Sequence, residues 1–88
     1  MSDNEKLYKS LFTSLVYTLN MTAMQQLGQV INPMTGRAEK DPEQANLTIE
    51  MLKMLAEKTR NNLAADEESF LKQIIDQLTA HYNMPGKS

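Results

Sequence analysis

The 88-residue sequence has no cysteine and no tryptophan, and it has only three glycines and three prolines. Without cysteine the chain has no disulfide, no thiolate nucleophile and no cysteine-based zinc site, which agrees with a reducing compartment. A single domain of this length has a small core and often gains stability from a disulfide, a metal or a second subunit. With disulfides excluded, association between copies is the support that we expect.

The chain also lacks an excess of charge of either sign. Nine Lys and Arg residues are scattered among eleven Asp and Glu residues, so the net charge is -2 and the pI is about 5.3. Binding of nucleic acid needs clustered basic residues, so we expect no nucleic-acid partner. The polar, acidic first residues do not indicate a signal peptide. We therefore predict a cytoplasmic protein.

Long hydrophobic runs are absent as well. Residues 10–36 carry no charge, but Thr13, Asn20 and Gln25 are among the polar residues that interrupt this stretch. A membrane-spanning helix needs about 20 mostly apolar residues in succession. We therefore expect no membrane span.

Apolar residues recur at intervals of three and four, the spacing of amphipathic helices. The pattern predicts three helices, over about residues 4–27, 42–60 and 65–82, and no strand-like alternation occurs between them. The expected fold is all-α, with residues 1–88 forming one helical domain. We expect a helical bundle that is completed by oligomerisation.

Turn-forming residues separate the predicted helices. Gly28 can close the first helix in a left-handed conformation, and Asp41 followed by Pro42 is typical of a helix start. Between them we expect a loop over 29–40. A frayed tail is predicted over 83–88.

The apolar face of the first helix is wider than one short chain can cover. It spans an arc of roughly 200°, whereas a surface helix needs only about 100°. The second helix adds three apolar residues that lie off its core side, although these could also fill gaps in a monomeric core. We predict an interface between subunits made of Leu7, Leu11, Phe12, Leu15, Val16, Leu19, Ala23, Leu27, Leu47, Met51 and Met54.

No arrangement of residues predicts catalysis. His81 is the only histidine, and general-base and metal sites need converging partners, so we expect no catalytic residue, no metal and no cofactor. The loop could contact a partner or could simply connect two helices. Its candidate residues are Asn32, Pro33, Thr35, Gly36 and Arg37.

The order and spacing of several short motifs resemble a small bacterial family catalogued as domain of unknown function 1844. The resemblance spans about residues 11–82 and implies a stand-alone helical cytoplasmic protein, with no catalytic residues to carry over. The family commonly has Thr where Ala64 stands, which puts the start of the third helix in doubt. The motifs are Phe12-x-x-Leu15-Val16, Ala23-x-x-x-Leu27-Gly28, Asn32-Pro33-x-Thr35-Gly36, Met54-Leu55-x-x-Lys58-Thr59, Asn62-Leu63 and Glu67-Glu68.

These observations favour a non-enzymatic interaction module. It would bind itself, as a homodimer or a higher oligomer, and could bind another protein. The alternative is a small-molecule binder or enzyme with a site formed between subunits, using polar groups such as Tyr17, Asn20 and His81. Peripheral attachment to a membrane is the least favoured hypothesis, because the first helix lacks a face rich in Lys and Arg.

Overall fold

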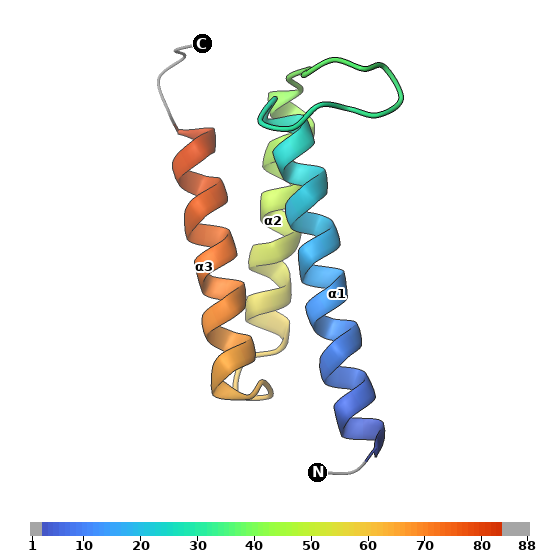
Figure 1. Cartoon of the computed structure of the whole chain (residues 1–88). Helices are drawn as coiled ribbons and strands as arrows, with labels where there is room; N and C mark the ends of the chain where they lie inside the picture. The colour runs from blue at the N-terminus through green and yellow to red at the C-terminus, as the bar shows by residue number, and fades with distance from the viewer. Residues whose placement is uncertain (1–2, 84–88) are drawn as a thin grey trace.

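The computed structural model describes residues 3–83, and these residues form three helices and no strand. Helix α1 spans Asp3–Gln26, α2 spans Pro42–Lys58 and α3 spans Ala65–Tyr82. Helix α2 runs antiparallel to the other two and packs against both (Figure 1). The predicted all-α fold is confirmed. Of the predicted tail, Asn83 forms the C-cap of α3, and 84–88 lie outside the described residues.

Local signals set the ends of α2. The Oδ1 atom of Asp41 accepts a hydrogen bond from the backbone N–H of Gln44 at 3.3 Å, and Pro42 occupies the first helical position. This cap satisfies one of the N–H groups that a helix start leaves without an intrahelical partner. The helix ends at Lys58, two residues earlier than expected, and Asn61 then reverses the chain with a φ of 66°.

Helix α3 begins at Ala65 although its N-cap, Ala64, has no side-chain oxygen. The Oε1 atom of Glu67 instead accepts a hydrogen bond from the backbone N–H of Ala64 at 2.9 Å. This is the half of a capping box that does not depend on the N-cap side chain. The start of α3, which the sequence alone did not settle, is therefore stabilised by the side chain of Glu67, the third residue of the helix.

One core lies between the three helices. Its only buried polar side chain among the described residues is that of Thr48, whose hydroxyl donates to Gln26 Oε1 at 2.6 Å. That bond joins α2 to the end of α1. Buried apolar side chains form the rest of the core: Val16, Ala23, Leu27, Ala45, Ile49, Leu52, Leu71, Ile74 and Leu78.

Helix α1 is longer than the helices that cover it. It has 24 residues, against 17 in α2 and 18 in α3, so it extends beyond the connection between α2 and α3 (Figure 1). At 1.5 Å per residue the excess is roughly 9 Å, or more than one turn. None of the helices in the described part of the chain is long and apolar enough to cross a membrane.

An ion pair joins α1 to α3 near this end of the bundle. The Nζ atom of Lys9 lies 2.7 Å from Oδ2 of Asp66. The hydrogen bond from Lys9 holds the pKa of the Asp66 carboxyl below its usual value, and the same bond raises the pKa of Lys9. Both side chains are solvent-exposed, so the pair makes a small contribution to stability that salt screens.

The pH dependence of this contribution can be isolated with Lys9→Met. Because the pKa of Asp66 is lowered from 3.8, the stabilisation is complete above that pH and is lost as the pH falls through the folded-state value. Because the pKa of Lys9 is raised from 10.5, it is complete below that pH and is lost as the pH rises further. Urea unfolding of both proteins should give a difference in stability that is constant from about pH 5 to 9 and shrinks outside that range. A difference that is as large at pH 3 as at pH 7 would contradict this assignment.

Candidate interaction surface

A stripe of exposed leucines runs along the first half of α1. Leu7, Leu11 and Leu15 lie four residues apart, so successive side chains are about one turn apart on one side of the helix. Gln26 marks the side that faces α2, because its Oε1 accepts from Thr48. Leu15 lies eleven residues before Gln26 and so only about 20° from it around the helix axis. The stripe therefore begins beside α2 and turns outward towards Leu7.

A second stripe runs along α2. Its members are Leu47, Met51 and Met54, and all three are exposed. Thr48 marks the side of α2 that faces α1. Met51 lies about 60° from Thr48 around the helix axis, in the direction opposite to the buried Leu52. This stripe flanks the contact between α1 and α2 on its outer side.

Both stripes face away from α3. On α1, Lys9 marks the α3 side through its ion pair with Asp66, and it lies about 100° beyond Gln26 in the direction opposite to Leu7. On α2, the outer stripe lies opposite the side that enters the core. The two stripes thus belong to one face of the molecule, which we call the outer face. It consists of Leu7, Leu11, Leu15, Leu47, Met51 and Met54, each between 46% and 54% exposed.

The α1 part of the outer face has little charge, whereas the exposed Lys58 extends the α2 stripe, four residues after Met54 and on the same side of the helix. From Ser10 to Gly36 the chain contains no charged residue, so Thr18 and Thr22 are the polar side chains beside the leucine stripe. On α2, Glu50 and Lys53 form an ion pair on another side of the helix. An apolar face of this size bounded by polar residues is typical of an interaction site.

The structure divides the eleven predicted interface residues between surface and core. Six form the outer face. Val16, Ala23 and Leu27 are buried within the chain's own core, so they are not available to a second subunit. Phe12 and Leu19 are partly buried and pack against that core. The wide apolar arc of α1 is therefore half core and half surface.

The segment 27–41 between α1 and α2 is ordered by its own backbone. Antiparallel bridges join Leu27 to Lys40 and Asn32 to Arg37, and the Asp41 N–H donates to the Gln26 carbonyl at 2.7 Å. The sequence predicts a loop over 29–40, and the two bridges within it are an additional feature of the structure. We call this segment the arm, because it projects from the end of α1 on the side away from α3 (Figure 1).

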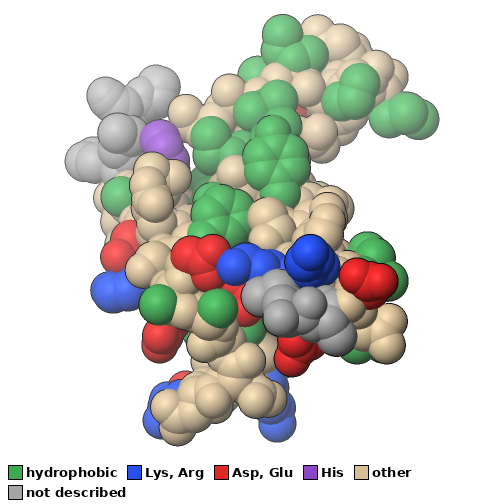
Figure 2. All heavy atoms as spheres, turned by 60° about the horizontal axis from the view of Figure 1, so that its bottom comes forward, with side chains coloured by type: hydrophobic (Ala, Val, Ile, Leu, Met, Phe, Trp, Pro, Cys, Tyr) green, Lys and Arg blue, Asp and Glu red, His purple; other side chains and the backbone are tan. Residues whose placement is uncertain are grey.

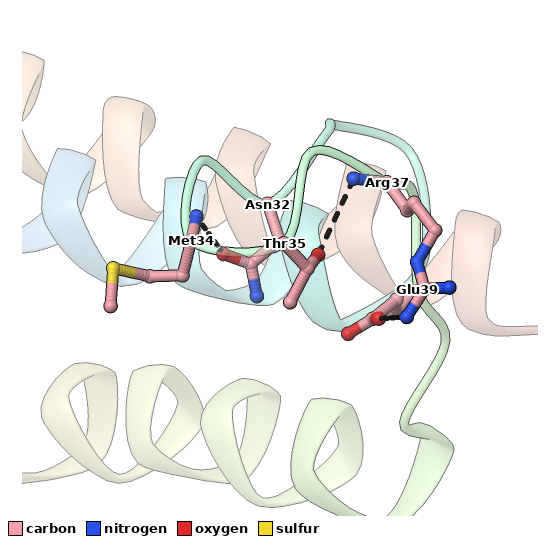
Figure 3. Close-up of polar contacts among 5 residues, drawn as sticks. All are labelled: Asn32, Met34, Thr35, Arg37 and Glu39. Carbon is pink, nitrogen blue, oxygen red and sulfur yellow. Dashed lines mark hydrogen bonds and ion pairs between the residues drawn. The ribbon is translucent and has the colours of Figure 1, made fainter.

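The predicted loop residues form the tip of the arm. The Oδ1 atom of Asn32 accepts from the Met34 N–H at 2.8 Å, the Asn32 carbonyl accepts from the Gly36 N–H at 2.7 Å, and Gly36 has a φ of 72°. Arg37 pairs with Glu39 at 3.0 Å. Figure 3 shows the Asn32–Met34 hydrogen bond and the Arg37–Glu39 ion pair, with the Met34 side chain pointing away from the ion pair. The polar groups at the tip are therefore largely used in holding its shape.

Two apolar residues of the arm escaped the sequence analysis. Met34 is 90% exposed and Ile31 is 60% exposed. The sequence did contain a signal for the exposure of Met34. This residue stands between Pro33 and Thr35 in a turn, where a side chain points to solvent more often than into a core. Pro33 is exposed as well.

The polar residues named for an intersubunit site lie on the side of α1 and α3 away from the outer face. Asn20 lies eleven residues after Lys9 and so faces α3, with Tyr17 farther round the helix. The Nδ1 atom of His81 is buried without a hydrogen-bond partner. Figure 2 shows hydrophobic side chains running from the arm towards the middle of the molecule on the side where His81 lies. No hydrogen bond within the described residues joins Tyr17, Asn20 and His81.

Two hollows in the described part of the molecule have no residue of the outer face in their lining. A pocket of about 260 Å³ between α2 and α3 is lined by charged and apolar residues, including Arg60, Lys72 and Ile75. Another, of about 430 Å³, lies beside the start of α1 and is lined by Tyr8, Phe12 and others. Within residues 3–83 no three His, Asp or Glu side chains are placed to share a metal ion.

The chain matches a protein-family model over most of its length. The family described as Domain of unknown function (DUF1844) matches residues 9–84. Neither the curated proteins nor the solved structures contain a match to the chain.

Proposed function

This chain belongs to the family described as Domain of unknown function (DUF1844), and we propose that it acts as a self-associating interaction module. The observation that carries the proposal is the outer face. Six large apolar side chains, contributed by two packed helices, are each about half exposed on one side of an 88-residue protein. The simplest partner for such a face is the same face of a second copy, which gives an isologous dimer.

The energetics favour this reading. Six half-exposed side chains correspond to about three fully exposed ones, and burying a large apolar side chain is worth about 1.5–3 kcal/mol. Two copies would therefore gain about 9–18 kcal/mol from the outer faces alone. Association costs about 4–15 kcal/mol in lost motion, so the gain is of the size that a stable dimer needs.

Charge supports the same arrangement. Two identical faces that carried Lys or Glu would place like charges opposite each other, which is costly. Leu11 and Leu15 lie in a stretch without charge from Ser10 to Gly36, so two copies can meet around these residues without that penalty. The cytoplasmic location predicted from the sequence stays a prediction.

A second candidate function rests on His81. A buried imidazole nitrogen without a partner loses the hydrogen bond that water would supply, unless another molecule provides it. Together with Asn20 and Tyr17 it could contact a small polar ligand on the side of the molecule away from the outer face. A site of this kind between subunits would need an association other than the one through the outer face. Stabilisation of the wild-type protein by a small molecule, absent in His81→Phe, would favour this function over a purely structural association.

Solution mass measured by light scattering over a range of dilutions tests the proposal. We expect a mass near twice 10.0 kDa that falls towards 10.0 kDa on dilution below the dissociation constant. A mass of 10.0 kDa at every concentration, in a protein with a helical circular dichroism spectrum, would overturn the proposal.

A further inference from the structure

The arm and the free end of α1 lie at opposite ends of the same helix, and both expose apolar side chains. At the arm these are Ile31 and Met34, and at the start of α1 they are Leu7 and Tyr8, which are 51% and 64% exposed. Because α1 extends past the connection between α2 and α3, its first turn lies beyond the chain's other helices, and Tyr8 just after it borders a hollow beside that connection (Figure 1). Each end offers a surface that the same chain cannot bury.

The arm is long enough to reach a neighbouring helix. Arg37 and Lys40 are three positions apart on the returning strand, and an extended chain advances about 3.3 Å per residue, so the Asn32–Arg37 bridge stands about 10 Å from the Leu27–Lys40 bridge at the end of α1. Packed helices lie about 8–10 Å apart. The tip can therefore pass over the end of a helix that packs on the outer face.

An antiparallel pairing of two α1 helices brings these ends together. Leu15 is close to the middle of α1, twelve positions after Asp3 and twelve before Leu27. If a two-fold axis passes beside Leu15, the base of the arm in one copy is level with Asp3 of the other. Leu7 is then about one turn, or roughly 6 Å, away along the helix. A parallel pairing would instead place arm beside arm and leave Leu7 and Tyr8 uncovered.

We infer that the arm clasps a second copy of the chain, with Met34 and Ile31 packed on Leu7 and Tyr8 at the start of the partner's α1. This inference rests on the proposed self-association, and it adds the orientation and a second contact. An isologous dimer makes the contact twice, once at each end of the paired helices. Methionine suits such a role because its unbranched side chain adapts to the surface that it meets.

Cysteine placement tests the contact, because the chain has no cysteine of its own. An equimolar mixture of Leu7→Cys and Met34→Cys is treated with a short thiol-to-thiol cross-linker and separated by denaturing electrophoresis. We expect a covalent dimer from the mixture and little from either variant alone. Leu15→Cys alone should also give a covalent dimer, because two copies of residue 15 meet at the two-fold axis.

Two controls make the result specific. A mixture of Met34→Cys with Gln73→Cys, an exposed position on α3, should give no covalent dimer above background. Adding Leu15→Glu to both chains of the productive mixture should abolish the product, because the cross-link depends on association through the outer face. A product of equal yield in either control would show random collision and would overturn the inference.

The remaining outcomes separate the two proposals. Cross-linking of Leu15→Cys without any product from the Leu7→Cys and Met34→Cys mixture would leave the self-association standing and remove the arm contact. Cross-linking of Met34→Cys to itself would show a parallel pairing and would also overturn the inference. No product from any of these proteins, with a solution mass of 10.0 kDa, would instead overturn the self-association itself.

Discussion

Replacing Leu52 with alanine should lower the free energy of unfolding by about 2–5 kcal/mol, the usual cost of truncating a buried leucine. Leu52 is fully buried at the middle of α2, where α1 and α3 both pack. A chain of 88 residues has a total stability of only about 4–13 kcal/mol, so the loss is a large share of it. Urea unfolding followed by circular dichroism measures the effect.

Leu47→Ala is the matched control for Leu52→Ala. It makes the same chemical change on the same helix, but at a residue that is 52% exposed. At a concentration where the protein is monomeric, we expect a loss of less than about 1 kcal/mol. Equal losses at the two positions would show that the core does not lie where the structure places it.

Leu15→Glu should weaken self-association about 100-fold or more while leaving the monomer folded. The residue is 46% exposed in the single chain, so the new carboxylate stays in water in the monomer. In the dimer two carboxylates would meet near the two-fold axis on an apolar face, which costs both desolvation and repulsion. A factor of 100 corresponds to about 2.7 kcal/mol. Light scattering at several dilutions gives the dissociation constant, and circular dichroism reports the fold.

Tyr17→Glu separates the outer face from the opposite side of α1. Tyr17 is also large and 56% exposed, but it is two residues farther along and so about 160° away from Leu15 around the helix. We expect Tyr17→Glu to associate like the wild-type protein. If Tyr17→Glu dissociated the protein and Leu15→Glu did not, the interface would lie on the α1–α3 side and our assignment would be wrong.

The helices could be predicted because local features determine them. Asp41 and Pro42 stand where α2 begins, and Gly28, with a φ of 78°, follows the end of α1 by two residues. Predicted and observed helix ends agree within two residues. The larger error was at the end of α2, where Thr59 hydrogen-bonds back to Leu55 outside the helix proper.

The division between core and surface could not be predicted, because it depends on where the other helices pack. Val16 and Leu15 are neighbours of similar character, yet Val16 is fully buried and Leu15 is not. Their positions differ by 100° around α1, and only the placement of α2 and α3 decides which of them enters the core. The bridges of the arm were missed for a similar reason, since they join residues up to thirteen positions apart.

Helix α2 follows α1 and precedes α3 in the sequence, and it packs against both more extensively than α1 and α3 pack against each other. Contacts between such neighbouring helices join residues that are close in the sequence. Small helical proteins whose contacts are of this kind fold in microseconds to milliseconds. Two copies at about 1 μM, meeting with an ordinary rate constant of about 10⁶ M⁻¹s⁻¹, would take roughly a second to associate. Folding would therefore be complete long before encounter, and the dimer would assemble by docking of two finished monomers.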